Sequence, residues 1–350
     1  MTTKQAEKKA PKKKFNSIII GAKLHIILEI NTFFLNFTPK ISVTRVYSNM
    51  KHLLAISLLA VLLWQCNTSQ QNKNQNKAQK EIPPEEYQYS LEKALIMGEK
   101  VEMLNLKGQS LKKIPSELSN LKNLKSLYIA NNPDLDLEAA INIMAKLPNL
   151  EELDLSGYKL KQIPRNISKL KTLKALWLTD NPKIDLESTF EILKDLPKLR
   201  ELFLTDNALE KLPENIGNLK NIELLYLDRN NLKQLPQGIK GLTKLKMIGL
   251  ISNFDLNWTT VINQLADLKM LDVLMIGNNK IKELPNEISK LKKLEVLWLD
   301  GNELVSMPDS IGKIEKLTDL YLQGNPLAPT VKNALQSLLN PKTKVVYESK

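Results

Sequence analysis

Leucine and other aliphatic residues recur at fixed spacing along most of this chain. From Val101 onward the template L-x-x-L-x-L-x-x-N-x-L occurs ten times, at intervals of 23 or 26 residues. The last two leucines of L-x-x-L-x-L are two residues apart, so they face the same side of a short strand. One coil alone cannot enclose a core, so the pattern predicts stacked coils that bury their leucines against one another. The copies begin at Val101, Leu124, Leu150, Leu173, Leu199, Ile222, Leu245, Leu271, Leu294 and Leu317.

The ninth template position is asparagine in eight of the ten copies. An asparagine amide both donates and accepts hydrogen bonds, so stacked asparagines are expected to satisfy buried backbone groups at the turn. Gln109 and Tyr158 are the exceptions, and Gln109 falls in the first coil, where an atypical cap is expected. The asparagines are Asn132, Asn181, Asn207, Asn230, Asn253, Asn279, Asn302 and Asn325.

The segments between the templates are of two kinds. The 23-residue copies carry a proline at an equivalent place, which suits an irregular convex segment because proline fixes φ and donates no hydrogen bond. The 26-residue copies instead show helical spacing of apolar residues, and Asp136, Asp185 and Asn257 are the expected N-caps. The helices are predicted from Leu137, Ile141, Met144 and Leu147; from Leu186, Phe190, Leu193 and Leu196; and from Trp258, Ile262, Leu265 and Leu268.

Over residues 90–339 the chain resembles the leucine-rich-repeat family, in the 23-residue variety of bacterial lipoproteins and secreted proteins. The resemblance implies an α/β fold: a curved solenoid with an inner parallel β-sheet and a convex face of irregular or 3-10 segments and short helices. It also implies an N-terminal cap helix over residues 89–100, started by Ser90, before ten repeats over 101–339. Leu335, Leu338 and Leu339 then form an amphipathic close, and residues 340–350 are a C-terminal tail.

The region before the repeats suggests export. Residues 50–66 begin Met-Lys-His, continue through twelve mostly apolar residues and end at Cys66, which resembles a bacterial lipoprotein signal peptide with Cys66 as the lipidated residue. Trp64 and Gln65 depart from the small residues of that motif. Because a signal peptide begins a chain, we expect translation to start at Met50 and residues 1–49 to be an untranslated extension. The alternatives are a buried apolar segment and, for residues 1–49, a basic membrane-surface segment.

Residues 67–88 are rich in Asn, Gln and Lys and are interpreted as a flexible polar linker between anchor and repeats. This arrangement places the protein at the bacterial cell envelope, on the outer membrane or surface, with membrane attachment through Cys66. If the signal is not used, the expectation changes to a cytoplasmic scaffold or signalling adaptor.

Charge and composition exclude several kinds of chemistry. The net charge is +12, but residues 1–66 hold ten Lys or Arg against two Glu, so only +4 remains for the rest. That argues against nucleic acid as a partner, because a duplex-binding domain carries its positive excess on the folded part. Cys66 is the only cysteine, and both histidines precede it, so the repeats lack thiol nucleophiles, imidazole bases and the usual zinc ligands. We therefore expect no enzyme activity, no cofactor and no metal.

The fifth template position points out of the core and defines the concave face. Six of its ten residues are aromatic in a chain that is 5% aromatic, which is typical of interface anchors. Lateral packing between strands is the competing explanation. The ten residues are Asn105, Tyr128, Asp154, Trp177, Phe203, Tyr226, Gly249, Met275, Trp298 and Tyr321.

Acidic residues flank this column, which favours a partner with basic and apolar groups over a merely solvated surface. The predicted partner-binding residues are Tyr128, Asp154, Trp177, Asp180, Phe203, Asp206, Tyr226, Asp228, Met275, Trp298, Asp300 and Tyr321. The predicted function is binding of a macromolecule, in the first place a protein, through the concave face. A glycan-binding surface protein is the alternative, since aromatic platforms and carboxylates suit sugars as well.

Overall fold

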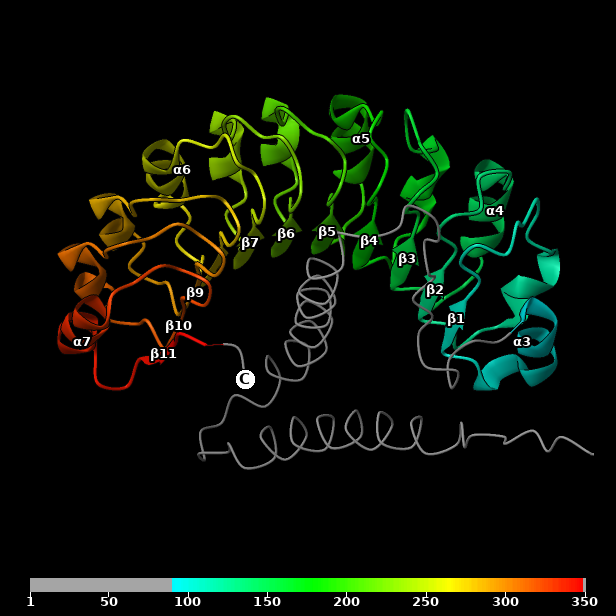
Figure 1. Cartoon of the computed structure of the whole chain (residues 1–350). Helices are drawn as coiled ribbons and strands as arrows, with labels where there is room; N and C mark the ends of the chain where they lie inside the picture. The colour runs from blue at the N-terminus through cyan, green and yellow to red at the C-terminus, as the bar shows by residue number, and fades with distance from the viewer. Residues whose placement is uncertain (1–89, 349–350) are drawn as a thin grey trace, which may run out of the picture. The chain divides into compact units, whose positions relative to one another are not determined.

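The computed structural model describes residues 90–348. The expectations for the extension at 1–49, the signal peptide at 50–66 with Cys66, and the linker at 67–88 lie outside the described residues. The described residues form an arc whose inner side carries the strands and whose outer side carries the helices (Figure 1).

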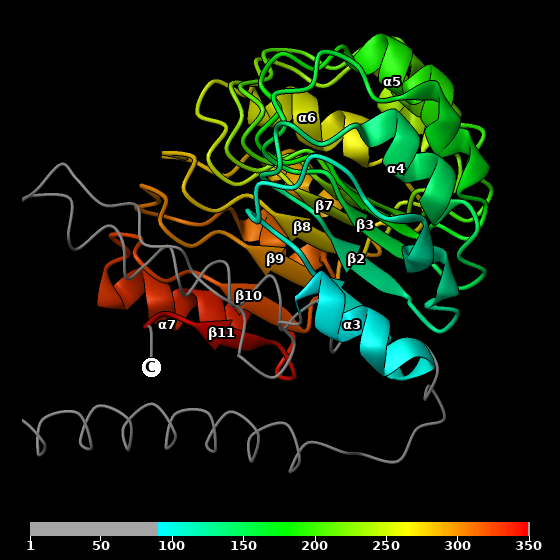
Figure 2. The ribbon, with the colours of Figure 1, turned by 90° about the vertical axis from the view of Figure 1, so that its right-hand side faces the viewer.

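The inner side is a single sheet of eleven parallel strands in sequence order. Figure 2 shows several of these strands lying side by side. Each strand spans three residues and pairs in register with the next, so that Leu104 lies beside Leu127 and Leu127 lies beside Leu153 on adjacent strands. Equivalent template positions therefore form columns along the sheet. The strands are β1 (Met103–Asn105), β2 (Ser126–Tyr128), β3 (Glu152–Asp154), β4 (Ala175–Trp177), β5 (Glu201–Phe203), β6 (Leu224–Tyr226), β7 (Met247–Gly249), β8 (Val273–Met275), β9 (Val296–Trp298), β10 (Asp319–Tyr321) and β11 (Lys344–Val346).

The outer side alternates between two local structures, as predicted. Each proline of the 23-residue copies stands in extended conformation immediately before a five-residue 3-10 helix, as Pro213 does with φ −73°. The 3-10 helices are η3 (Ser116–Asn120), η4 (Arg165–Lys169), η5 (Glu214–Asn218), η6 (Gln237–Gly241), η7 (Asn286–Lys290) and η8 (Asp309–Lys313). The three predicted helices of the 26-residue copies are present as α4 (Leu137–Met144), α5 (Leu186–Leu193) and α6 (Trp258–Leu265).

The predicted N-caps are confirmed. Asp136, Asp185 and Asn257 accept backbone N–H groups at the starts of α4, α5 and α6. Between sheet and outer layer lies one continuous aliphatic core, in which the template leucines are buried. Each fully buried leucine contributes roughly 1.5–3 kcal/mol of transfer free energy, so the repeat itself supplies the stability of the stack.

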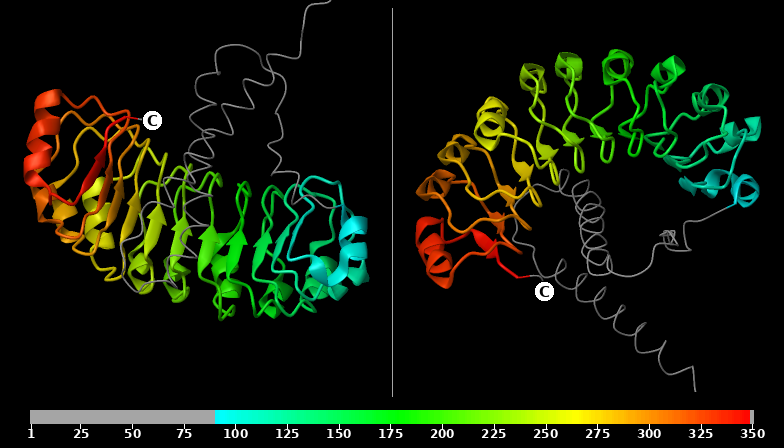
Figure 3. Two further views of the ribbon diagram at one scale, coloured as in Figure 1. Left: turned by 90° about the horizontal axis from the view of Figure 1, so that it is seen from below. Right: turned by 45° about the horizontal axis from the view of Figure 1, so that its top comes forward.

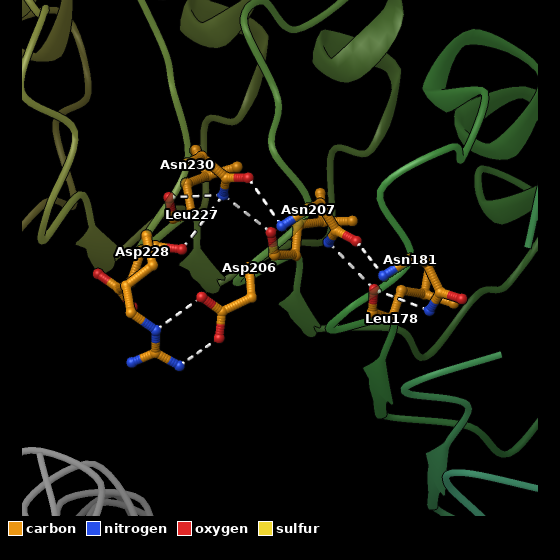
Figure 4. Close-up of polar contacts among 9 residues, drawn as sticks. Leu178, Asn181, Asp206, Asn207, Leu227, Asp228 and Asn230 are labelled. Carbon is orange, nitrogen blue, oxygen red and sulfur yellow. Dashed lines mark hydrogen bonds and ion pairs between the residues drawn. The ribbon is translucent and has the colours of Figure 1, made fainter. Parts of the chain in front are cut away.

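The asparagine column runs through the turns that follow the strands (Figure 4). Asn207 Nδ2 donates to Leu178 O at 3.0 Å, and Asn207 Oδ1 accepts from Asn181 N at 2.6 Å. Asn230 repeats the pattern one coil later by accepting from Asn207 N at 3.0 Å. The asparagines thus satisfy buried backbone groups of the preceding coil, as predicted. Tyr158 takes over this role in its own coil, since its hydroxyl donates to Ile129 O at 2.6 Å.

Both ends of the solenoid are closed by helices. At the N-terminus, α3 (Leu91–Met97) begins after Ser90, whose hydroxyl accepts from Lys93 N, and η2 (Gly98–Lys100) leads into the sheet. At the C-terminus, α7 (Pro329–Leu338) buries Leu335. Leu338, expected in this amphipathic close, is instead 38% exposed.

The C-terminal tail differs from the expectation. Residues 344–346 form β11 and pair with β10, so they extend the sheet by one strand. No leucine template marks this strand, which explains why the repeat pattern did not predict it. Two further views show the strands side by side from below and the arc with its top tilted forward (Figure 3).

Candidate functional site on the concave face

The fifth template position forms one column across the sheet, as predicted. In register, Tyr128 faces Asp154, Asp154 faces Trp177, and the order continues to Tyr321. We call this the aromatic column: Asn105, Tyr128, Asp154, Trp177, Phe203, Tyr226, Gly249, Met275, Trp298 and Tyr321. Its members come from ten different coils, so only the stacking of repeats brings them together.

The rings of the aromatic column contact one another in two groups. Trp177, Phe203 and Tyr226 stack face to face with ring centroids 4.4 Å apart. Tyr128 meets Trp177 edge-on at 5.9 Å across Asp154. Trp298 and Tyr321 form the second group, with centroids 4.5 Å apart. Gly249 and Met275 separate the groups, and offset or edge-to-face pairs of this kind contribute about 0.5–1.5 kcal/mol each beyond burial.

Exposure along the aromatic column is uneven. Phe203 and Tyr226 are 8% and 6% exposed, and Met275 and Trp298 are 3% and 5% exposed. Tyr128, Trp177 and Tyr321 are only partly buried. The expectation that every outward side chain is freely accessible is therefore wrong for these four residues, and Asn105 and Gly249 of the same column are buried too. The ring stacks show that part of the column serves the scaffold.

The third template position forms a neighbouring column that divides the concave face into two halves. Over β3, β4 and β5 this column carries Glu152, Ala175 and Glu201. Over β6 to β9 it is apolar throughout, with Leu224, Met247, Val273 and Val296. Counting two residues from each repeat start would have found this division in the sequence. The acidic half borders Trp177, whereas the apolar half borders Met275 and Trp298.

The acidic half holds two carboxylates on either side of a small residue. Glu152 accepts a hydrogen bond from the Tyr128 hydroxyl at 2.8 Å, which orients both side chains. The Glu201 carboxylate makes no hydrogen bond or ion pair with any described residue. Burial, together with the carboxylates of Glu152 and Glu223, raises the pKa of Glu201 to about 7. This concentration of negative charge beside Trp177 is suited to a cationic group.

The second template position carries a ladder of alternating charge. Lys125 pairs with Glu102 at 2.8 Å and Lys174 with Glu151 at 2.7 Å, while Glu223 lies 2.7 Å from Lys246. Exposed pairs of this kind stabilise a fold by about 0–1 kcal/mol. The ladder thus neutralises most of the flanking charge locally. Glu152 and Glu201 lie outside these ion pairs.

The predicted aspartates serve different purposes. Asp206 forms a two-point pair with Arg229, in which Arg229 Nε lies 2.8 Å from Asp206 Oδ1 (Figure 4). Asp228 is buried and accepts the Ile251 N–H at 2.8 Å, and burial raises its pKa to about 6. Asp180 is exposed at φ 54°, a left-handed conformation.

Asp154 and Asp300 complete the set. Asp154 accepts the Ser156 N–H at 2.9 Å, and burial raises its pKa. Asp300 is 7% exposed, and its Oδ1 has no hydrogen-bond partner among the described residues. Asp154 and Asp228 are thus engaged by the backbone, which the sequence pattern could not show. Asp180 presents its carboxylate to solvent, whereas the unpartnered Oδ1 of Asp300 is buried.

Nothing in the described residues points to metal chemistry. Within residues 90–348, no three His, Cys, Asp or Glu side chains are arranged to hold a metal ion. In the same part of the chain, no helix has the length and hydropathy to cross a bilayer.

A family model described as leucine rich repeat matches residues 197–253 and 264–327. Among solved structures, the chain is similar to an internalin of Listeria monocytogenes, with 23% identity over 71% of this chain and 74% of that chain and a TM-score of 0.48. It is also similar to a leucine-rich-repeat protein of Leptospira interrogans, with 22% identity, coverage of 74% and 99%, and a TM-score of 0.26. Comparison with curated proteins gives no match.

Proposed function

We propose that this chain, whose repeats belong to the leucine-rich-repeat family, binds a partner protein through its concave face and catalyses no reaction. Repeat solenoids of this kind generally use an extended concave surface to bind other proteins. One observation supports the proposal most: over β2 to β5, half-buried Tyr128 and Trp177 lie beside the carboxylates of Glu152 and Glu201. An aromatic anchor bordered by acidic groups is suited to a protein surface with basic and apolar side chains.

Comparative affinity capture from cell-envelope extract tests this proposal. Trp177→Ala removes the most central of the partly exposed rings, so it should lose a partner that the wild-type chain captures. Phe254→Ala is the matched control, because Phe254 is an aromatic side chain that is 52% exposed and lies outside the strands. Capture by the wild type and the control but not by Trp177→Ala supports the concave face. Equal capture by all three chains, or loss with Phe254→Ala alone, overturns it.

We also propose that the chain is tethered to a bacterial envelope membrane through a lipid on Cys66. The support is the sequence of residues 50–66, in which a positive start and twelve mostly apolar residues lead to the only cysteine. The polar segment at 67–88 would then serve as the tether to the repeats. Metabolic labelling with a fatty-acid analogue should mark the wild type and not Cys66→Ser. An unlabelled wild-type chain contradicts the anchor.

Glycan binding is a second candidate for the concave face. Its specific support lies at the C-terminal end of the sheet, where Trp298 and Tyr321 are followed two residues later by Asp300 and Gln323. Tyr321 and Gln323 are only partly buried, although Asp300 Oδ1 and Gln323 Oε1 are themselves buried and have no hydrogen-bond partner among the described residues. A partly exposed ring beside an amide side chain suits sugar hydroxyls. Binding on a glycan array that Tyr321→Ala abolishes, and Trp177→Ala does not, would favour this candidate.

A further inference from the structure

Each coil enters its strand through a two-residue turn, and these turns are rich in lysine. Eight of the nine turns before β2 to β10 carry lysine, and the only acidic residue in them is Glu315. Because the strands are parallel and in register, all nine turns lie in one row along the N-terminal ends of the strands. We call this row one edge of the sheet, and the row of C-terminal strand ends the opposite edge. We call the following residues the turn lysines: Lys122, Lys171, Lys198, Lys220, Lys244, Lys269, Lys292, Lys293 and Lys316.

The opposite edge of the sheet has the opposite sign. There, the seventh and eighth template positions carry four acidic residues and two basic ones. One basic residue, Arg229, is already paired with Asp206. The acidic residues are Asp180, Asp206, Asp228 and Asp300, and the second basic residue is Lys107. The solenoid is therefore polarised across its sheet, basic where strands begin and acidic where they end.

The charge of the turn lysines is not neutralised within the described residues. All nine are exposed, and none forms an ion pair there. Lys122, Lys171 and Lys269 donate only to backbone carbonyls, and Lys244 donates to Asn221 Oδ1. By contrast, Lys125, Lys174 and Lys246 of the concave face all have carboxylate partners. Of these two sets of lysines, only the turn lysines lack a carboxylate partner among the described residues.

Neighbouring turn lysines act together electrostatically. Adjacent strands are about 4.8 Å apart, which is shorter than the Debye length of roughly 8 Å at physiological ionic strength. A row of like charges at that spacing repels itself, and an extended anionic surface relieves the repulsion. A folded partner with a single acidic patch would meet only a few of the nine lysines.

The chemistry of the row favours phospholipid headgroups over nucleic acid. The turns contain no aromatic residue and no arginine, so they offer neither a stacking platform for bases nor a bidentate fork. Lysine ammonium groups are point charges that bind phosphate without regard to its orientation. Clusters of lysine close to a membrane contribute about 1 kcal/mol per residue with anionic lipid.

We propose that the edge formed by the turn lysines lies on an anionic phospholipid surface. This inference rests on the proposed tether at Cys66, which would hold the repeats close to a membrane. Contact along this edge sets the orientation of the arc, because the strands then run away from the bilayer and the acidic edge is presented outward. The concave face stays open to a partner at its side.

Vesicle binding of the full chain carrying Cys66→Ser tests the proposal without an attached lipid. The probes are phosphatidylcholine vesicles with and without phosphatidylglycerol, at low and high salt. Lys198→Gln, Lys220→Gln and Lys292→Gln are combined, since none of these ammonium groups donates a hydrogen bond to a described residue. At about 1 kcal/mol per lysine, the triple variant should lose roughly a hundredfold in its partition coefficient for anionic vesicles at low salt.

The matched control removes the same charge elsewhere. Lys112, Lys161 and Lys282 are exposed and follow the eleventh template position, beyond the acidic edge. Their combined change to Gln should leave partitioning within about twofold. An equal loss in both triple variants, or no preference of the parent chain for phosphatidylglycerol, overturns the proposal. The proposal is also overturned if the turn-lysine variant loses binding to duplex DNA but keeps its binding to vesicles.

Failure of this proposal is separable from failure of the proposed partner site. Trp177→Ala should leave vesicle partitioning unchanged, and the turn-lysine variant should still capture the partner of the concave face. A turn-lysine variant that partitions normally but no longer captures that partner would assign the row to the protein interface and contradict the membrane contact.

Discussion

Two columns of side chains run the length of the sheet, one inside the coils and one outside. The inner column is asparagine in eight of its ten positions, and the amides satisfy backbone groups of neighbouring coils. The outer aromatic column is interrupted at Asp154, Gly249 and Met275, and its exposure varies from one strand to the next. A column committed to the scaffold varies little, because each coil has the same backbone groups to satisfy. The variation of the outer column indicates that the fold does not require an aromatic residue at each of its positions.

Removing an asparagine should have the largest effect on stability. Asn207→Ala leaves Asn181 N without its buried partner and removes one of the two amide donors to Leu178 O, and an unsatisfied buried group costs about 1–3 kcal/mol. We expect a loss of about 3 kcal/mol in the free energy of unfolding, measured by urea denaturation. Asn286→Ala, at an exposed asparagine, is the control and should cost less than about 0.5 kcal/mol. Similar losses of unfolding free energy for the two variants would mean that the asparagine column does not stabilise the stack of coils.

Removing an aromatic side chain should have a smaller effect on stability and a larger one on binding. Trp177→Ala breaks the stack with Phe203 but leaves no buried polar group unsatisfied, so we expect a cost of about 1–2 kcal/mol. Partner affinity should fall at least about tenfold, as for other aromatic anchors. Isothermal titration calorimetry with the captured partner measures the affinity. If Trp177→Ala unfolds part of the protein and the fraction that stays folded binds the partner with wild-type affinity, the Trp177 ring has a structural role only.

The acidic half of the concave face should make stability depend on pH. The pKa of Glu201 is raised from 4.5 to about 7, so the folded state holds this proton more tightly than the unfolded state does. Its stabilising contribution is complete below about pH 4.5 and is lost as the pH rises to about 7. Glu201→Gln should remove this dependence, on the order of 1 kcal/mol in unfolding experiments across that range. Glu303→Gln, at an exposed carboxylate, should leave it intact.

The smallest effect is expected for the ion pair at the acidic edge. Asp206→Asn weakens the contact with Arg229, and both side chains are about 40% exposed. We therefore expect a loss of about 0.5 kcal/mol that disappears at high salt. Thermal unfolding at low and high ionic strength measures this. A salt-independent loss would mean that the contact acts through packing and not through charge.

The sequence predicted what depends on periodicity. The strands, the 3-10 segments after the prolines, the three helices with caps at Asp136, Asp185 and Asn257, and the asparagine column all follow from spacing and local hydrogen bonding. It did not predict β11, because Lys344–Val346 carry no template leucine.

The sequence was least informative about the state of each outward side chain. Phe203 and Trp298 occupy the predicted column, yet they are buried. Asp154 and Asp228 were expected to be free for a partner, yet they accept backbone N–H groups. Such details depend on rotamers and on what the neighbouring coil offers, and spacing carries no information on either.

Site-specific alkylation tests the central claim, that the concave face over β3 to β5 contacts the partner. With Cys66→Ser removing the only cysteine, Thr179→Cys places a thiol next to Trp177, whereas Thr259→Cys places one on the exposed side of α6. Bound partner should slow maleimide labelling at position 179 by about tenfold or more and leave labelling at position 259 unchanged. Equal labelling rates at position 179 with and without the partner would contradict the account.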